Sequence, residues 1–299
     1  GTPAVAQTLA DTGATAIAME LVPRISRAQS MDVLSSMATL AGYKAVLLGA
    51  SEAPRIMPML MTAAGTLNPM RVLIMGAGVA GLQACAAAKR IGAVVEAYDV
   101  RAAAREQILS VGAKPVELDL ETESSEDTGG YAREQSEEFI ARQQELMAEV
   151  LAEQDMVITT AAVPGAKSPI LVTEAMVKRM KPGAVIVDLA AERGGNCELT
   201  RLGETVVAHG VKILGPENLA ATLPTHASQM FGKNMEVLLG HIIDEDGKLK
   251  LDFEDEIIHE TVIAHDRDIP HKRMRELLHL PAREENIIDL TENATGEAS

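Results

Sequence analysis

A glycine pattern between a short apolar run and a helix-like run restricts the folds open to this chain more than any other feature. Val72–Met75 are four apolar residues, as in a short buried strand. Gly76-x-Gly78-x-x-Gly81 follows, and then the alanine-rich run Leu82–Arg90, which predicts a helix. A strand, a glycine turn and a helix in this order are the context that makes the pattern a dinucleotide-binding fingerprint.

Each glycine of the pattern has its own expected role. Gly76 permits the tight turn, Gly78 lets the backbone approach a pyrophosphate, and Gly81 lets the helix pack on the strand. The start of the helix adds free N–H groups and the positive end of the helix dipole. The pattern therefore predicts a phosphate site at this turn.

The next apolar run ends in an acid that bears on the choice of nucleotide. Residues 94–99 read as a second strand, and Asp99 lies 18 residues after Gly81. A carboxylate at this point accepts the hydroxyls of an adenosine ribose and repels a 2′-phosphate. The spacing indicates NAD(H) rather than NADP(H).

Strand-like and helix-like runs alternate along most of the chain. After the glycine turn we expect strands at 115–118, 156–159, 184–188, 205–208 and 211–214, and helices at 102–111, 134–153 and 173–180. This alternation predicts an α/β fold with a doubly wound parallel sheet of Rossmann type. Elsewhere we expect a remnant of a second α/β subdomain at 4–19, a helix at 29–48, an irregular or short helical link at 51–70, a helix at 223–243 and an edge strand at 249–253.

These patterns divide the chain into four parts. Residues 1–35 are expected to end an N-terminal subdomain, and residues 36–220 to form the nucleotide-binding domain. Residues 221–270 would return to the first subdomain, and residues 271–299 would form a charged tail or linker. The chain starts Gly-Thr-Pro without Met, which indicates that further residues precede it.

Composition argues against several classes of protein. A net charge of −16 disfavours nucleic acid as a partner. Two cysteines are too few for a disulfide framework, and neither they nor the seven histidines show metal-ligand spacing. No apolar run approaches the ~20 residues needed to span a bilayer. These counts favour a reduced, metal-free domain with an aliphatic core.

Three loops are candidates for the ligand crevice. Residues 160–165 and 191–196 follow expected strands, and such loops line the crevice of a doubly wound sheet. Residues 119–131 are acidic, carry two glycines and lack periodicity. A loop of that length fits either a lid that closes on the crevice or a solvated surface loop.

An unusually polar segment, residues 20–36, lies between two apolar ones. On the helix expected from residue 29, Gln29, Asp32 and Ser36 would lie near one another, with Ser35 one turn from Asp32. The pattern fits either a binding face or a helix start with capping side chains.

Six stretches resemble the alpha subunit of the proton-translocating NAD(P) transhydrogenases, a family related to alanine dehydrogenase. The resemblance covers about residues 1–260, and its most specific portion is the polar segment, whereas many dehydrogenases share the glycine pattern. The stretches are Leu21–Ser36, Gly76–Gly81, Tyr98–Arg101, Gly129–Ala132, Ile158–Ala161 with Pro164–Gly165, and Glu192–Cys197.

The resemblance implies two groups of site residues. Those expected to hold the nicotinamide and its ribose, and so to carry the reaction, are Arg24, Gln29, Asp32 and Ser35, in a segment that also places Ser30, Met31 and Val33 at the cofactor. Those expected to bind the rest of NAD(H) are Gly76, Gly78, Val79, Gly81, Asp99, Val100, Arg101, Thr160 and, on a mobile loop, Gly130 and Tyr131.

The resemblance also implies a reaction and its partners. The chain would bind NAD(H) and pass hydride directly to NADP⁺ on a partner domain or beta subunit, coupled to proton movement through a membrane domain. It would be a homodimer, inactive without those partners, and peripheral on the cytoplasmic side of the inner membrane, or in the matrix of mitochondria. Only hydride moves, so positioning and exclusion of water would supply the catalysis.

Two other functions stay open. An NAD-dependent dehydrogenase of alanine would need a carboxylate clamp and an acid–base histidine, and no such pair stands out in the sequence. An NAD-binding scaffold would need neither. Pyruvate and ammonia with NADH would identify the dehydrogenase, and an NADP analogue with the partner domain would separate the transhydrogenase from the scaffold.

Overall fold

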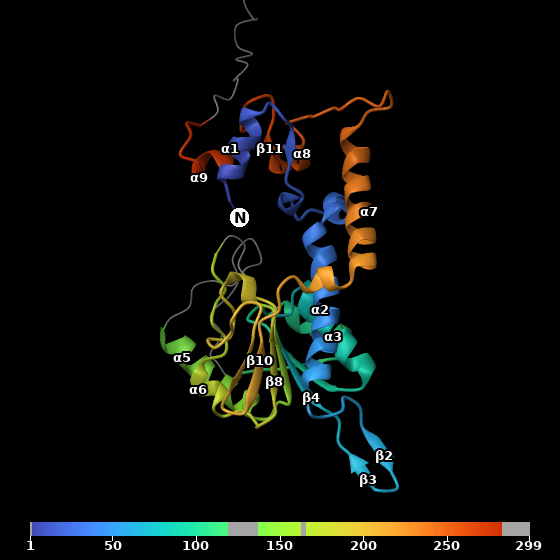
Figure 1. Cartoon of the computed structure of the whole chain (residues 1–299), viewed down its shortest axis with the longest axis vertical. Coiled ribbons are helices and arrows are strands. Elements are labelled where there is room, and N and C mark those ends of the chain that lie inside the picture. The colour runs from blue at the N-terminus through green and yellow to red at the C-terminus, as the bar shows by residue number, and fades with distance from the viewer. Residues whose placement is uncertain (1, 119–136, 163–165, 283–299) are drawn as a thin grey trace, which may run out of the picture. The chain divides into compact units, whose positions relative to one another are not determined.

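The computed structural model describes residues 2–118, 137–162 and 166–282, and these form two compact units. Unit 1 takes its residues from 1–33 and 233–299, and unit 2 from 34–232. The chain passes from one unit to the other inside two helices, α2 (Val33–Glu52) and α7 (Pro224–Ile242) (Figure 1).

Unit 2 is built on a seven-stranded sheet, which confirms the predicted α/β doubly wound fold. Its strand order is β6-β5-β4-β7-β8-β10-β9. The strands are β4 (Arg71–Met75), β5 (Val94–Tyr98), β6 (Lys114–Pro115), β7 (Met156–Thr159), β8 (Val185–Asp188), β9 (Thr205–Ala208) and β10 (Val211–Leu214).

The last strand departs from the expected parallel arrangement. β9 pairs with β10 antiparallel, whereas the other neighbours in the sheet are parallel. His209 and Gly210 between them both have positive φ, 53° and 77°. Two such residues form the hairpin turn that joins antiparallel strands, and a parallel connection would need a much longer crossover.

Helices cover both faces of this sheet. Val72 and Ile74 of β4 belong to one buried cluster, together with residues of α2 and α3 (Val79–Ile91). Leu73 and Met75 belong to a second cluster, with residues of α5 (Glu137–Ala152) and α6 (Glu174–Val177) (Figure 1). The alternation along the strand therefore buries both of its faces, which is typical of a parallel sheet. A further helix, α4 (Ala104–Ser110), lies between β5 and β6 in the chain.

Helix α2 corrects the expectation that no apolar run could span a membrane. It has 20 residues and contains an 18-residue window with a mean hydropathy of 1.4, so by length and composition it could cross one. However, part of α2 belongs to the core of unit 2, where Ala45 and Val46 are fully buried. A Cβ on Gly42 would lie 2.1 Å from the carbonyl oxygen of Ala80, so α2 packs backbone to backbone against α3.

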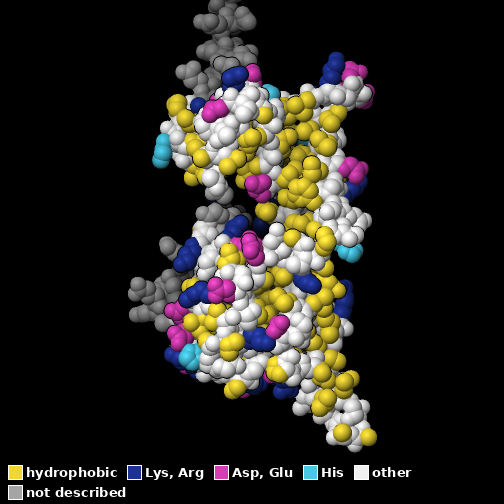
Figure 2. Space-filling view, viewed as in Figure 1, with side chains coloured by type: hydrophobic (Ala, Val, Ile, Leu, Met, Phe, Trp, Pro, Cys, Tyr) yellow, Lys and Arg dark blue, Asp and Glu magenta, His cyan; other side chains and the backbone are white. Residues whose placement is uncertain are grey.

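Two expected elements are wrong, and a third begins later than expected. Residues 51–70 contain a hairpin, β2 (Leu60–Thr62) and β3 (Gly65–Leu67), whose six residues are all exposed and therefore show no alternation (Figure 2). The helix expected at 29–48 is present as α2 but begins at Val33, because the backbone at Asp32 is extended, with φ −74° and ψ 94°. Residues 249–253 form no regular strand: Leu249 makes only a single antiparallel bridge to Ile243, and Lys250 donates its N–H to the carbonyl of Ile242.

Unit 1 pairs the two ends of the chain. β1 (Ala16–Ile17) pairs antiparallel with β11 (Val262–Ala264). The remaining elements of this unit are α1 (Ala4–Asp11), the 3-10 helices η1 (Met19–Leu21) and η2 (Ser26–Met31), α8 (Glu256–Thr261) and α9 (Lys272–Leu277). Neither α8 nor α9 was expected, because each has only six residues and too few turns to show a helical period.

Candidate functional site

The ends of four neighbouring strands form one line at the carboxyl edge of the unit 2 sheet. Met75 pairs with Tyr98 on one side and with Thr159 on the other, and Thr159 pairs with Asp188. The chain leaves β4 for β5 in one direction and later adds β7 on the opposite side. The ends of β4 and β7 therefore meet at the switch point where doubly wound sheets bind ligands.

The glycine turn has the geometry that the sequence predicts. Gly76 has φ 103°, and a Cβ there would lie 2.6 Å from the hydroxyl of Thr160. A Cβ on Gly81 would lie 1.8 Å from the carbonyl oxygen of Gly76, so the helix is seated directly on the turn. A Cβ on Gly78 would meet nothing within 4 Å. The space above Gly78, at the start of α3, is where a phosphate would fit.

Thr160 fastens the glycine turn to the neighbouring strand. Its N–H donates to the carbonyl of Met75 at 2.8 Å, and its hydroxyl donates to the carbonyl of Gly76 at 3.0 Å. The N–H of Gly76 donates to the carbonyl of Tyr98 at 2.8 Å. Thr160, which the sequence predicts as a cofactor contact, thus fixes the shape of the turn.

Asp99 bonds to the glycine turn and to Arg101. Its Oδ2 accepts the N–H of Ala77 at 2.7 Å and Nη2 of Arg101 at 3.0 Å. Its Oδ1 accepts the backbone N–H and Nε of Arg101, both at 2.9 Å. Burial raises the pKa of Asp99, but the hydrogen bonds from Arg101 and Ala77 outweigh it, so the pKa lies below its ordinary value. The carboxylate is therefore charged at neutral pH.

The arrangement at Asp99 adds a condition to the predicted ribose contact. A carboxylate has about four lone-pair positions, and four donors already occupy them. Ribose hydroxyls could bond to Asp99 only if the Arg101 fork released an oxygen. Val100, between the two, is half-buried.

A second carboxylate at the same edge, missed by the sequence analysis, is fully buried. Asp188 ends β8, and its side chain accepts five hydrogen bonds from hydroxyl and backbone N–H donors. These donors are Thr159 Oγ1, Ala190 N, Asn196 N, Cys197 N and Thr200 Oγ1, at 2.6 to 3.0 Å. The only signal in the sequence was its position at the end of a predicted strand.

Asn196 links the loops that follow β7 and β8. Its Oδ1 accepts the N–H of Ala161 at 3.0 Å, and its Nδ2 donates to the carbonyls of Ala161 and Pro169 at 2.9 and 2.8 Å. The Asn196 amide thus bonds to both the N–H and the carbonyl of Ala161, as the backbone of a neighbouring strand would. Asp188 therefore bonds to Thr159 and Asn196 bonds to Ala161, the two residues that flank Thr160.

Replacing Thr200 by valine is expected to lower the free energy of unfolding by about 1.5–3 kcal/mol, the usual worth of a hydrogen bond to a charged group. Valine keeps the shape but removes the 2.6 Å bond to Asp188. Urea unfolding followed by circular dichroism measures the change. Thr205→Val on the exposed face of β9 is the matched control and should stay within about 0.5 kcal/mol of the parent; equal stability of both variants would contradict the prediction.

The residues predicted to hold the nicotinamide lie on an irregular segment of unit 1. Gln29 and Ser30 are exposed on η2, Met31 is buried at its end, and Arg24 is exposed before it. Asp32 is half-buried just after η2. Val33 and Ser35 belong to α2, so Gln29, Asp32 and Ser36 do not share one helical face as expected.

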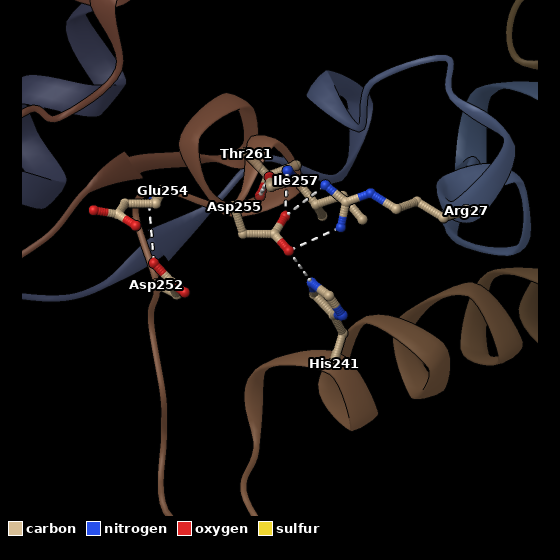
Figure 3. Close-up of polar contacts among 7 residues, drawn as sticks. All are labelled: Arg27, His241, Asp252, Glu254, Asp255, Ile257 and Thr261. Atoms are coloured by element: carbon tan, nitrogen blue, oxygen red, sulfur yellow. Dashed lines mark hydrogen bonds and ion pairs between the residues drawn. The ribbon is translucent and has the colours of Figure 1, made fainter.

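Asp255 anchors this segment from α8 (Figure 3). Arg27 donates to it through both ends of its guanidinium, Nη1 to Oδ2 at 2.8 Å and Nη2 to Oδ1 at 3.1 Å. The Arg27 guanidinium lowers the pKa of Asp255 to about 2. The stability that the charged Asp255 gains from this ion pair is complete above the ordinary pKa of 3.8 and is lost as the pH falls through about 2.

Two further expectations concern the lid and the metal ligands. Gly130 and Tyr131, with the rest of the predicted lid at 119–131, lie outside the described residues. Within residues 2–118, 137–162 and 166–282, no group of three His, Cys, Asp or Glu side chains could hold a metal. Cys85 and Cys197 are free and buried, and burial raises their pKa values to about 12 and about 11.

Comparison with known proteins places this geometry in one family. Models of the N-terminal and C-terminal domains described as "Alanine dehydrogenase/PNT" match residues 1–41 and 45–272. The first of the polypeptides that make up NAD(P) transhydrogenase subunit alpha in Rhodospirillum rubrum is 53% identical over 259 residues, which is 86% of this chain and 67% of the relative. Alanine dehydrogenase of Bacillus subtilis is 34% identical over 74% of this chain and 54% of its own.

A solved structure agrees with these matches. The crystal structure of transhydrogenase from Sinorhizobium meliloti superposes with a TM-score of 0.79 at 46% identity, covering 89% of this chain and 71% of that one. This chain thus spans between half and three quarters of each relative's length.

Proposed function

The chain belongs to the alanine dehydrogenase/PNT family, and from that premise we propose that it is the NAD(H)-binding component of a proton-translocating transhydrogenase. Its cofactor is NAD(H), and it passes hydride to NADP⁺ held by a partner. The higher identity to the transhydrogenases, 53% and 46% against 34%, favours this function over alanine dehydrogenase.

The observation that carries the proposal is the pairing of an open glycine turn with a charged acid. Gly78 presents bare backbone to free space at the start of α3, and Asp99 lies beside the same turn, bonded to Ala77. The turn fits a pyrophosphate and the acid fits an adenosine ribose. Both features lie at the switch point of the sheet, where the fold family binds its nucleotide.

The residues of this chain act by placing the cofactor. Bound NADH would supply the hydride from its nicotinamide ring. The α3 N-terminus and Asp99 hold the other end of the molecule, and Arg24, Gln29, Asp32 and Ser35 orient the ring. The hydride transfer itself involves no proton transfer, so these side chains contribute by orienting the ring and by excluding water from the reacting atoms.

Transfer from NADH to an NADP⁺ analogue, in the full-length protein with an NADP(H)-binding partner, tests the proposal directly. Hydride transfer that needs both nucleotides and the partner supports it. Oxidation of NADH by pyruvate and ammonia without a partner would instead identify an alanine dehydrogenase. NADH binding with neither reaction would leave an NAD-binding scaffold.

The rest of the assembly follows from the same premise. We infer that the partners are an NADP(H)-binding domain or beta subunit and a membrane domain that moves protons. Two copies of the chain form a homodimer, as a peripheral component of the complex on the cytoplasmic side of the inner membrane or in the mitochondrial matrix. Co-purification with a membrane subunit tests this placement.

Gln29→Asn is expected to slow hydride transfer about tenfold while changing NADH affinity by less than about threefold. Shortening the side chain by one methylene moves its amide away from the ring, and loss of one polar contact costs about 1–3 kcal/mol in the transfer step. Stopped-flow measurement at saturating nucleotide separates rate from affinity. A parent-like rate with weakened binding would make Gln29 a binding residue only.

A further inference from the structure

The segment that carries Gln29 depends on outside contacts for its shape. η2 is a 3-10 helix of six residues, Ser26–Met31, whereas this geometry is usually limited to three or four because its hydrogen bonds are poorly aligned. It ends at Asp32, where the backbone is extended. Contacts with the rest of unit 1 must therefore determine where its exposed side chains lie.

Two sets of contacts hold the buried side of η2. Ala28 is fully buried and Met31 nearly so, in an apolar cluster with residues of α7 and α8. Asn234 of α7 donates its amide to the carbonyl of Ser30 at 2.8 Å. These contacts fix the depth of the segment, but they leave its solvent side, which bears Arg27 and Gln29, to be held separately.

The Arg27–Asp255 ion pair holds the solvent side. Both carboxylate oxygens take part, at 2.8 and 3.1 Å, so the guanidinium has one orientation. Asp255 is itself fixed, because its Oδ1 accepts the N–H of Ile257 as the N-cap of α8 and its Oδ2 lies 3.2 Å from Nε2 of His241 (Figure 3). Arg27 is thus bonded to the capped N-terminus of α8, and it lies two positions before Gln29 in the sequence.

We propose that Arg27 and Asp255 are a positioning pair for hydride transfer, which set the place of Gln29 without touching the cofactor. The inference rests on the proposed function. Arg27 is half-exposed, and such surface ion pairs contribute only about 0–1 kcal/mol to stability. The fold should therefore survive without the pair, whereas a displacement of about 1 Å at a reacting group can cost about a hundredfold in rate.

A double-mutant cycle tests the pair. Arg27→Met keeps the apolar stem, and Asp255→Asn keeps the N-cap of α8, since Asn and Asp cap equally well. Each single variant is expected to slow single-turnover hydride transfer about tenfold. The double variant should be no slower than either single one, because each change removes the same interaction. NADH affinity should stay within about twofold, and Arg27→Lys, which keeps the charge but not the fork, should recover some of the rate.

Arg179→Met is the matched control. Arg179 forms a similarly exposed ion pair with Glu145 at 3.1 Å in unit 2, and its loss should leave the rate at the parent value. Parent-like rates in both single variants, or losses that multiply in the double variant, would overturn the proposal. A loss of NADH affinity equal to the loss of rate would assign the pair to binding and also overturn it.

Hydrogen exchange separates this proposal from the proposed function. The amides of residues 26–32 should exchange faster in Arg27→Met and Asp255→Asn than in the parent, a measurement that needs no partner. Unchanged exchange would show that the pair does not hold the segment. A parent protein that binds NADH but transfers no hydride would overturn the function, and the exchange rates would still decide whether the pair fixes η2.

Discussion

Gly81→Ala is expected to lower the free energy of unfolding by about 3 kcal/mol, the upper end of the cost of overpacking. Alanine in place of glycine inside a helix normally adds about 1 kcal/mol of stability. Here the sign reverses, because the new methyl group would lie 1.8 Å from the carbonyl oxygen of Gly76 and 3.2 Å from the hydroxyl of Thr160. The helix would have to move off the turn. Urea unfolding followed by circular dichroism gives the difference.

Gly78→Ala is the matched variant, and its effect should fall on binding alone. Gly78 has φ −76°, which suits alanine, and a Cβ there meets nothing within 4 Å, so stability should stay within about 1 kcal/mol. The methyl group would instead occupy the space expected for the pyrophosphate. We expect NADH affinity to fall about a hundredfold, or about 2.7 kcal/mol. Parent-like NADH titration of this variant would show that the nucleotide does not lie on the turn.

Asp99→Asn should weaken NADH binding about ten- to a hundredfold, since a hydrogen bond to a charged group is worth about 1.5–3 kcal/mol. In the parent, the N–H of Ala77 and the guanidinium of Arg101 bond to the two carboxylate oxygens of Asp99. An asparagine would offer these donors only one acceptor oxygen. Its NH₂ group donates and cannot accept a ribose hydroxyl, so the single oxygen would have to serve the turn, the guanidinium and the ribose. Fluorescence quenching by NADH measures the loss. Glu117→Gln, which breaks the exposed pair with Arg105, should bind NADH as the parent does.

The same variant should lose its preference for NADH over NADPH. In the parent, Asp99 is expected to repel a 2′-phosphate, and it pairs with Arg101, a cation that could otherwise attract one. Asparagine removes the repulsion and releases the guanidinium. The affinity for NADPH should therefore either rise or show a much smaller fall than the affinity for NADH. Equal affinity of the parent for the two nucleotides would contradict the assignment of Asp99 as the residue that selects NAD(H).

The sequence predicted the portions of the fold that repeat a strong local pattern. β4, the glycine turn and α3 were found within a few residues because an apolar strand, three spaced glycines and an alanine-rich helix each leave a clear signal. The hairpin at β2 and β3 was missed, since all its residues are exposed and no alternation marks it. The antiparallel edge strand β9 depends on a two-residue turn that carries only one glycine.

The candidate site was only partly predictable, for a related reason. Asp99 and the glycines stand at fixed spacings, and the structure places them around one turn. The partners that restrain them do not follow any spacing: Arg101 folds back on Asp99, and Asp255 reaches Arg27 across 228 positions of sequence. The roles of Asp188 and Asn196 were not predicted, because tertiary contacts define a buried polar network and no local sequence pattern indicates them.

The amide of Asn196 has a consequence for how long the molecule stays chemically intact. Asparagine is a thermolabile residue, and its breakdown begins when the peptide nitrogen of the next residue attacks the side-chain carbonyl. That nitrogen, of Cys197, is bonded to Asp188 at 3.0 Å, and the carbonyl oxygen of Asn196 is held at Ala161. The attacking atom and its target are restrained by separate partners. The bonds that fix this loop therefore also protect it from spontaneous deamidation, which would place a second carboxylate against two carbonyl oxygens.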